Sequence, residues 1–524
     1  MDLDVLSVRS FFEQAVAAFP DEPFLIWTPD GSVITYAQAE DRIDRAANVW
    51  HTLGVRKGDR VAFMADNSPD FLIAWLGLAK IGGVLVAINT GFRAVEASYL
   101  VADSEARFAL VDPKYLPLFD DVRQRAECLE TVLTIGQHED VPSFTALMDG
   151  AEPCAPPVEL HGDDLISLIY TSGTTGNPKG VMQTHRNFVL TGQAYGHWMR
   201  MSRGQRIYAC LPLFHINSQA YSTMGVIGIG GALVLAPRFS AGAFWDDVRK
   251  HRVNVFNFIG AMTVILSKKE PAPDDADHDV HIAYGVPALD AKIRGDIERR
   301  FGLQVISGFG MSETTFGLLE PLDEERRPGS MGVPRHHPDP SVPRTEARIV
   351  DDEGREVGPG VVGELVLRNA AMMSGYFRDP ERTAEALVDG WLHTGDSAHR
   401  DADGFFFFVD RKKDIIRRRG ENVSSLEVER VIERHPGVQE AAVIGVPSEL
   451  TDEELLTYIV RRPGAEVRAK EIFDWCADNL AAFKVPRYLE FIDALPKTPT
   501  SKIQKALLRG TAASPGRVDR TAMV

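Results

Sequence analysis

The chain has 524 residues, more than one hydrophobic core usually organises, so several domains are expected. Hydrophobic residues make up 44% and charged residues 25%, close to the averages of globular proteins, which argues against wholesale disorder. The formal net charge of -17 argues against a nucleic-acid-binding protein, because binding a polyanion requires a basic surface. Small anionic substrates stay compatible with this charge, since local basic clusters bind them.

In roughly the first 160 residues, short apolar strands alternate with segments of helical spacing. The spacing predicts helices over 36–53 and 71–81, and strands over 60–64, 83–88 and 108–111. Strands that alternate with helices favour a mostly parallel sheet with both faces covered.

Two apolar runs are candidates for membrane spans. The run 71–90 is long enough to cross a bilayer, but Lys80 and the pair Gly82 and Gly83 interrupt it. The run 224–236 is shorter and is also broken by glycines. The first run is predicted to form a buried helix, a glycine turn and a buried strand, and both runs are predicted to belong to an α/β core, so no membrane insertion is expected.

The alternation resumes after a glycine-rich stretch at 172–180. Helices are predicted over 188–201, 244–251 and 291–301, and strands over 205–209, 232–235, 253–258 and 303–307. From about residue 330, short strands separated by turns, such as 346–350 and 363–367, indicate a small antiparallel barrel.

A new small unit begins after residue 410. Helices are predicted over 425–434 and 469–479, strands over 440–446 and 455–460, and a loose tail over the last dozen residues. The predicted fold class is therefore α/β. A large N-terminal domain of two mostly parallel α/β subdomains plus a small β-barrel precedes a small α+β C-terminal domain.

The four cysteines, Cys128, Cys154, Cys210 and Cys476, form no C-x-x-C pair, so a zinc site or thioredoxin-type motif is unsupported. A disulfide framework is not expected in so large a chain. The N-terminus has two early acidic residues and no basic region before an apolar stretch, unlike a signal peptide. A cytoplasmic location is predicted.

The strongest motif is YTSGTTGNPKGV at 170–181. Residues 171–177 are all glycine, asparagine or hydroxyl-bearing, and they follow the apolar strand 165–169. Glycines let the backbone approach a phosphate, hydroxyls donate hydrogen bonds, and Lys179 supplies positive charge. We predict a phosphate-binding loop between a strand and a helix, and we disfavour a flexible linker, which would not need the Pro178–Gly180 end.

Two other phosphate motifs do not fit. A Walker A loop would have serine or threonine after its lysine, but Gly180 follows Lys179. A dinucleotide fingerprint fails at 228–233 and at 308–313, because the third glycine is missing from both.

TSGTTGNPKG resembles the signature loop of the adenylate-forming superfamily, which includes acyl-CoA synthetases, firefly-type luciferases and peptide-synthetase adenylation domains. Further motifs of that family follow in the same order over nearly the whole chain. The resemblance implies that the loop binds ATP through Thr171, Ser172, Gly173, Thr174, Thr175, Gly176 and Lys179.

The next family-like motifs are LPLFH at 211–215 and SGFGMSET at 307–314. The resemblance implies that His215 gates the carboxylate pocket, that Phe309 stacks on adenine beside Ser307 and Gly308, and that Ser312 contacts the α-phosphate. It also implies that Glu313 and the Thr171 hydroxyl hold Mg²⁺, a hard ion that prefers oxygen ligands.

The C-terminal motifs are WLHTGD, DRKKD, GENV and LPKTPTSKIQK. By resemblance, Asp396 binds the ribose hydroxyls, Arg411 makes a second ribose or phosphate contact, and Lys413 marks a hinge. Arg417, Gly420 and Glu421 are implied to meet CoA, and Lys502 to reach the α-phosphate and the substrate carboxylate. Ser501 stands where most relatives have glycine. Taken alone, the charges at 410–414 would be read as a solvated charge run.

These positions imply an adenylation domain at 1–410, a hinge at 411–414 and a mobile C-terminal domain at 415–524. The acyl pocket is expected near His215, Asn217, Tyr221, Gly285, Phe316 and Gly317. This lining shows none of the paired carboxylates that a cationic substrate would prefer. Phe316 and Leu318 favour an apolar acyl group.

The predicted function is ATP-dependent ligation of a carboxylic acid to CoA through an acyl-adenylate, with ATP, Mg²⁺ and CoA as cofactors. Lys502, His215 and Glu313 are the predicted catalytic residues. The C-terminal half is similar to the crotonobetaine/carnitine-CoA ligase branch. A stand-alone enzyme that loads a carrier protein, a luciferase-like oxygenase and a non-catalytic binding member stay open, as does a homodimer.

Overall fold

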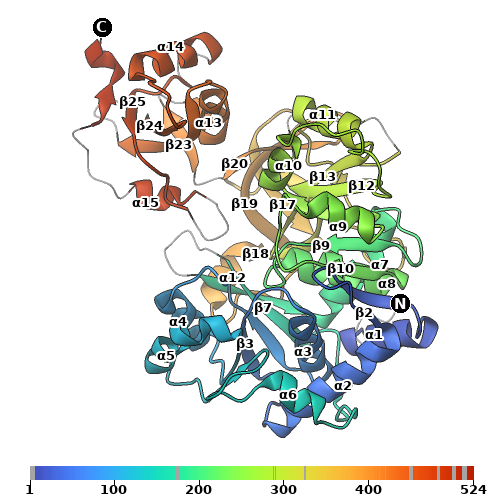
Figure 1. Ribbon diagram of the computed structural model, residues 1–524. Coiled ribbons are helices and arrows are strands. Elements are labelled where there is room, and N and C mark those ends of the chain that lie inside the picture. Colours follow the sequence, from blue (N-terminus) through green and yellow to red (C-terminus); the bar gives the residue numbers. More distant parts are fainter. Residues whose placement is uncertain are drawn as a thin grey trace. The chain divides into compact units, whose positions relative to one another are not determined.

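Figure 1 shows the computed structural model of the chain. It describes residues 6–171, 178–286, 288–289, 291–323, 326–411, 414–418, 421–447, 453–480, 484–497, 503–509 and 516–523. The chain divides into two compact units. The larger unit comprises Met1–Ala347 and Leu367–Leu392, and the smaller unit comprises Arg348–Val366 and His393–Val524.

The larger unit contains, within its described part, a six-stranded sheet in the order β6-β5-β3-β4-β7-β8. Its pairs are parallel except the last, β7 with β8. The strands are β3 (Arg60–Met64), β4 (Val84–Ala87), β5 (Phe108–Val111), β6 (Thr131–Thr134), β7 (Leu165–Thr171) and β8 (Lys179–Thr184). In β3, Val61 and Phe63 join one core cluster while Ala62 and Met64 join another, as expected for a strand buried on both faces.

A nine-stranded sheet, counted over the described residues, has the order β15-β14-β13-β12-β11-β9-β10-β1-β2. The strands are β1 (Pro23–Trp27), β2 (Val33–Thr35), β9 (Arg206–Ala209), β10 (Ala232–Leu235), β11 (Val255–Ile259), β12 (Ile282–Val286), β13 (Gln304–Met311), β14 (Thr314–Leu319) and β15 (Val333–Pro334). Neighbours from β1 through β10, β9, β11 and β12 to β13 are parallel, and β2, β14 and β15 are added antiparallel.

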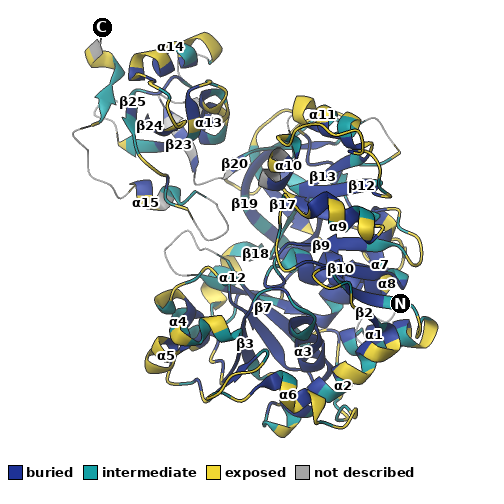
Figure 2. Cartoon of the chain, in the orientation of Figure 1, coloured by how far each residue is buried: buried dark blue, intermediate teal, exposed yellow. Residues whose placement is uncertain are grey.

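Helices form three layers around these two sheets. The outer helices are α4 (Ala94–Asp103) and α5 (Leu116–Arg125) on the six-stranded sheet, and α9 (Phe244–Lys250), α10 (Gly260–Ser267) and α11 (Ala291–Phe301) on the nine-stranded sheet. The helices that contribute to the cluster between the sheets are α1 (Val8–Ala18), α2 (Tyr36–Thr52), α3 (Pro69–Lys80), α6 (Phe144–Asp149), α7 (His185–Trp198) and α8 (Met224–Ile229). Figure 2 shows the buried strands and the exposed outer faces of α4, α5 and α11.

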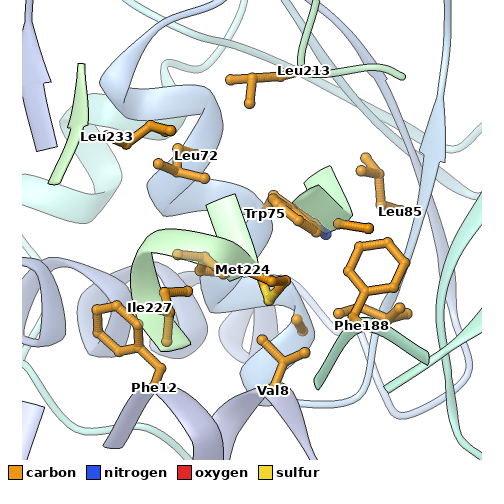
Figure 3. Packing of buried hydrophobic residues seen from close by; sticks show 14 of the residues in the cluster. Val8, Phe12, Leu72, Trp75, Leu85, Phe188, Leu213, Met224, Ile227 and Leu233 are labelled. Atoms are coloured by element: carbon orange, nitrogen blue, oxygen red, sulfur yellow. The ribbon is translucent and has the colours of Figure 1, made fainter. Parts of the chain in front are cut away.

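The central cluster joins both sheets through these helices. Figure 3 shows Trp75 of α3 beside Phe188 of α7, and their rings meet edge to face with centroids 6.0 Å apart. Aromatic pairs prefer such offset or edge-on geometry. The cluster therefore fixes α3 against α7, which follows the six-stranded sheet directly.

Both apolar runs form a helix, a turn and a strand, as the sequence predicts for the first run and, for the strand 232–235 alone, for the second. In the first run, α3 ends at Lys80, Gly82 takes a left-handed φ of 74°, and β4 begins at Val84. In the second, α8 ends before Gly230, with φ 60°, and β10 follows. Within the described residues, none of the helices combines the length and apolar character needed to cross a membrane.

A five-stranded sheet lies where the sequence predicts a small barrel. Among the described residues its order is β16-β17-β19-β18, with β20 pairing β19, and the β18–β19 and β19–β20 pairs are antiparallel. The elements are β16 (Glu346–Val350), β17 (Gly363–Arg368), α12 (Pro380–Ala386), β18 (Leu387–Val388), β19 (Trp391–Arg400) and β20 (Phe406–Arg411).

The smaller unit contains a four-stranded sheet, β23-β24-β25-β26, and the hairpin β21–β22 in its described part. The elements are β21 (Ile415–Arg418), β22 (Glu421–Ser424), α13 (Ser425–Glu433), β23 (Val438–Pro447), β24 (Glu453–Arg461), α14 (Ala469–Asn479), β25 (Tyr488–Phe491), α15 (Lys505–Arg509) and β26 (Val518–Asp519). Apolar side chains of α13 and α14 pack on β23 and β24.

Two sequence predictions are wrong. The loop after β7 leads into strand β8 rather than into a helix, because residues 179–184 pair with β7 and bury Val181, whereas α7 begins only at His185. The end of the chain is not a loose tail throughout. Val518 pairs with Leu489 in the sheet, and a 3₁₀ helix, Arg520–Met523, follows.

Candidate functional site

The predicted phosphate loop joins the ends of a β-hairpin. Thr171, the last residue of β7, pairs with Lys179, the first residue of β8. Ser172, Gly173, Thr174, Thr175 and Gly176 lie outside the described residues. The Thr171 Oγ1 atom is buried and has no hydrogen-bond partner among the described residues. An unpartnered buried hydroxyl is costly, so its lone pairs are suited to a ligand.

Lys179, Glu313 and Tyr376 form a compact polar cluster. The Lys179 Nζ lies 3.7 Å from Glu313 Oε1, donates to the Tyr376 hydroxyl, and sits 3.8 Å from the centre of the Tyr376 ring. The Tyr376 hydroxyl donates to Glu313 Oε1 at 2.9 Å. Burial, together with the Glu313 charge, raises the pKa of Tyr376, so this hydroxyl stays protonated as a donor.

Glu313 is held by the turn between β13 and β14. The Gln183 side chain donates to the Ser312 carbonyl at 2.5 Å, and Asn187 donates to Gln183 Oε1 at 2.8 Å. The backbone N–H of Met373 donates to the Glu313 carbonyl at 2.7 Å. Strand β8, helix α7 and the segment after β17 therefore fix one carboxylate that is 4% exposed.

The predicted adenine residues lie on β13, where glycines allow close packing. Ser307, Gly308 and Phe309 continue the strand, and Phe309 is 9% exposed. A Cβ atom on Gly308 would lie 2.8 Å from the Leu318 carbonyl, and one on Gly317 would lie 2.1 Å from the Phe309 carbonyl. Glycine at these two positions therefore permits the β13–β14 pairing.

Asn217 and Tyr221, predicted to line the acyl pocket, lie on a π-helical segment, Asn217–Thr223. Such segments are uncommon and frequently occur at functional sites. The Asn257 side chain donates to Asn217 Oδ1 at 2.9 Å and to Ser222 Oγ at 3.0 Å. His215 is partly exposed, and its ring lies 4.6 Å from that of Phe214.

Phe316, predicted to line the same pocket, is fully buried. Its ring packs edge to face on Trp198 at 4.9 Å and stacks on His337 at 6.2 Å. Gly285 precedes the end of β12, and a Cβ atom there would lie 2.5 Å from the Phe258 carbonyl.

The buried residue Arg335 belongs to none of the sequence motifs. Its guanidinium donates to the hydroxyls of Tyr284 at 2.9 Å and Tyr221 at 2.8 Å, and to the Thr315 carbonyl at 2.8 Å. Burial acts to lower the pKa of Arg335, but the two tyrosines outweigh it and the pKa lies above its ordinary value. Arg335 follows Pro334 in a stretch that matches no motif, so only its contacts reveal it.

The smaller unit holds the remaining described site residues. Asp396 lies on β19 and is 1% exposed, and in the antiparallel register its backbone partner on β20 is Arg411. Arg417 and Glu421 lie on the paired strands β21 and β22. Lys413, Gly420 and Lys502 lie outside the described residues, so their roles stay predictions.

The Asp410 carboxylate marks the start of α13. It accepts from Ser425 Oγ at 2.7 Å, from the Leu426 N–H at 3.1 Å and from Ser424 Oγ at 3.2 Å. An acidic group at a helix N-terminus is stabilised by the free N–H groups and the helix dipole. Asp410 therefore anchors the chain where the sequence predicts the hinge.

Comparison with known families decides the class. The model of the AMP-binding enzyme family matches residues 12–377, and that of the AMP-binding enzyme C-terminal domain matches residues 427–502. This chain belongs to the AMP-binding enzyme family. As a member, it is an AMP-forming acid–thiol ligase, and this class uses ATP, Mg²⁺ and CoA.

Individual relatives match this member of the AMP-binding enzyme family over nearly its whole length. Crotonobetaine/carnitine–CoA ligase of Salmonella heidelberg (strain SL476) is 34% identical over 522 residues, covering 96% of this chain and 99% of the relative. The anthranilate CoA ligase AuaEII in complex with anthranoyl-AMP has a TM-score of 0.86 and 28% identity, covering 97% of both chains. ATP-bound MatB from Rhodopseudomonas palustris has a TM-score of 0.85 and 28% identity, covering 96% of this chain and 98% of MatB.

Proposed function

We propose that this chain joins a carboxylic acid to CoA in two half-reactions at the site built around Lys179, Glu313 and Tyr376. The observation that carries the proposal is this polar cluster at the mouth of the β7–β8 hairpin, on a chain of the AMP-binding family. The relatives named above act on crotonobetaine or carnitine and on anthranilate.

The chemistry explains why ATP is needed. A carboxylate is a poor electrophile, so its oxygen first attacks the α-phosphorus of ATP and pyrophosphate leaves. The CoA thiol then attacks the acyl carbon of the acyl-adenylate, loses its proton, and AMP leaves. Negative charge on the phosphate oxygens must be stabilised in the first step, and fixed positive groups do this best when preorganised.

Glu313 and the Thr171 hydroxyl would hold Mg²⁺. Both are hard oxygen donors, and the Thr171 Oγ1 has no hydrogen-bond partner among the described residues. Bound Mg²⁺ would neutralise charge on the phosphate oxygens. Tyr376 orients the Glu313 carboxylate by donating to one of its oxygens, and Lys179 adds positive charge beside it.

The predicted division of labour assigns Lys502 to the first half-reaction alone. Lys502→Ala should abolish adenylate formation but largely preserve thioester formation from supplied acyl-adenylate. Equal loss of both half-reactions would contradict this assignment.

The function is tested by pyrophosphate release from ATP across short, medium, long, aryl, dicarboxylic and betaine-type acids, each with and without CoA. We expect acid-dependent release that CoA increases, with AMP and an acyl-CoA as products. Release that ignores CoA would instead indicate a carrier-protein acceptor or an oxygenase, and silence with every acid would contradict catalysis.

Two variants test the site. Lys179→Met should lower kcat about 10²- to 10³-fold, as removal of one preorganised charge commonly does. Lys470→Met is the matched control, because the Lys470 side chain is 69% exposed and forms an ion pair with Asp474 one helical turn away. Equal activity of the two variants would contradict the role of Lys179.

A further inference from the structure

Arg335 is a buried cation whose contacts with the described residues are all neutral. It is 3% exposed, and its hydrogen bonds go to the Tyr221 and Tyr284 hydroxyls and to the carbonyls of Thr315 and Phe309. Within the described part of the chain, no carboxylate lies among its contacts, and its Nε atom has no hydrogen-bond partner.

Three aromatic rings surround the same guanidinium. Its centre lies 4.7 Å from the Trp198 ring, 5.2 Å from the Tyr221 ring and 5.8 Å from the Tyr284 ring. Aromatic faces attract a cation, especially where water is excluded, so they offset part of the cost of burying the charge. They do not replace an anion, and the Nε–H donor is left over.

The same unit shows how a buried arginine is ordinarily neutralised. Arg294 is 7% exposed, and its Nη1 lies 2.6 Å from Glu320 Oε1, so its charge is paired within the protein. Guanidinium groups bind carboxylates with paired N–H donors, and this preference makes arginine the usual partner of buried anions. Arg335 has the donors for such a partner, and the described residues supply none.

Arg335 is attached to the predicted acyl pocket rather than to a remote part of the core. It contacts the hydroxyl of Tyr221 on the π-helical segment and the backbone of Thr315, next to Phe316. A polar set continues along that wall through Asn257, which contacts Asn217 and Ser222. The residues predicted to line the acyl pocket therefore contact polar groups and a buried cation as well as apolar side chains such as Phe316 and Leu318.

We propose that the acid carries a second anionic group, such as a second carboxylate, and that Arg335 recognises it. This proposal rests on the proposed function and names its substrate class. A quaternary ammonium acid places a positive charge beside the guanidinium and is disfavoured, whereas an anionic group supplies the missing counter-charge. Arg335 is then a residue that determines specificity rather than a catalytic residue.

The test compares dicarboxylic acids with their monoamides, which keep the shape and remove one charge. Pairs of increasing size are succinate and succinamate, glutarate and glutaramate, and phthalate and phthalamate, with a betaine-type acid added. The readout is kcat/KM for pyrophosphate release. We expect the wild-type enzyme to prefer the dicarboxylic member of at least one pair by 10-fold or more, and to use the betaine-type acid least well.

Arg335→Gln should remove that preference, lowering kcat/KM for the dicarboxylic acid while changing the monoamide less than 3-fold. Arg335→Lys should retain part of the preference. Arg203→Gln is the matched control, because the Arg203 side chain is 62% exposed and it should leave every ratio unchanged.

The proposal is overturned if the wild-type enzyme prefers monoamide, monocarboxylic or betaine-type acids. It is also overturned if Arg335→Gln lowers kcat/KM for all acids by the same factor. The wild-type panel stands even if a variant does not fold. Pyrophosphate release only with acids that lack a second anionic group would overturn this proposal but not the proposed ligase activity. No pyrophosphate release with any acid would overturn both.

Discussion

Two buried arginines, Arg335 in the larger unit and Arg418 in the smaller one, are neutralised differently. Arg418 in the smaller unit is 4% exposed, and its Nη2 lies 2.6 Å from Glu454 Oε2. Arg335 in the larger unit is 3% exposed and contacts tyrosine hydroxyls, carbonyls and aromatic rings. The first charge is neutralised by the fold, and the second depends on neutral groups.

This difference separates structural charge from charge that is available to a ligand. A buried ion pair has little charge left to offer a ligand, since each partner already neutralises the other. A buried cation among neutral groups keeps an unmet preference for an anion. The comparison predicts that the two arginines respond very differently to substitution. One further titrating group in each unit, Glu429 and His185, should give the two units opposite pH dependence.

The largest effect is expected at Arg418. Arg418→Met leaves the Glu454 carboxylate buried without this partner, which should cost about 3–5 kcal/mol of the free energy of unfolding of the smaller unit. Hydrogen exchange of the β23 and β24 amides measures the loss. Replacing both residues by methionine should recover most of it. A single variant as stable as the wild type would break the comparison.

The next effect concerns Glu429 of α13. Its carboxylate lies 2.8 Å from Lys505 Nζ and accepts from the Val443 N–H at 2.6 Å. Burial nevertheless raises the pKa of Glu429 from 4.5 to about 7. A raised pKa in the folded state means that its contribution to stability is complete below pH 4.5 and is lost as the pH rises through 7.

The free energy of unfolding of the smaller unit should therefore fall by on the order of 3 kcal/mol between about pH 4.5 and 7, because Glu429 ionises. Glu429→Gln cannot titrate, so its unfolding free energy should depend less on pH over this interval. Urea unfolding at closely spaced pH values checks this. An unchanged slope in the variant would show that Glu429 ionises normally.

The stability of the larger unit should decrease in acid because of His185, whereas that of the smaller unit increases in acid because of Glu429. Its ring is fully buried and its Nδ1 accepts from the Val8 N–H at 3.1 Å, and burial lowers the pKa of His185 from 6.5 to about 4. The unfolded chain binds this proton more readily, so stability is present above pH 6.5 and is lost as the pH falls towards 4.

At pH 5 this loss should reach about 2 kcal/mol. Hydrogen exchange in β3 and β4 at pH 5 and 7 measures it, with His185→Gln as the variant that lacks the titration. If the variant shows the same acid sensitivity as the wild type, another group is responsible.

The smallest effect on stability is expected at Arg335. Among the described residues, Arg335→Met leaves no carboxylate unpaired. Loss of the desolvation cost offsets the lost hydrogen bonds, so the free energy of unfolding should change by no more than about 1 kcal/mol. Thermal unfolding of the larger unit compares this variant directly with Arg418→Met. A loss as large as that at Arg418 would show that Arg335 is structural and would weaken its assignment to substrate recognition.

Much of the fold follows from short windows of sequence. The spacing of apolar residues predicted the strands 60–64 and 108–111 and the helix 291–301 with the bounds that the structure has. These elements are long enough, or alternate clearly enough, for their period to be visible locally. The motif order likewise placed the chain in its family, because each motif is a continuous run of residues.

Strands that form by pairing with a distant segment could not be predicted from a short window of sequence. Residues 179–184 mix polar and apolar side chains, and only pairing with β7 makes them a strand. Val518 belongs to a sheet because Leu489 offers it an edge. In both cases the hydrogen-bond partner lies beyond the local window, so intrinsic propensity could not decide.

The sequence by itself determined the family, and it predicted which residues take part in adenylate formation, since those residues stand in recognisable runs. Only the tertiary structure decided what surrounds them. Tyr376 reaches Glu313 across 63 residues, and Arg335 reaches Tyr221 across 114 residues. Such contacts depend on how distant strands and helices pack, and packing sets whether a buried charge is neutralised within the protein or is left for a substrate.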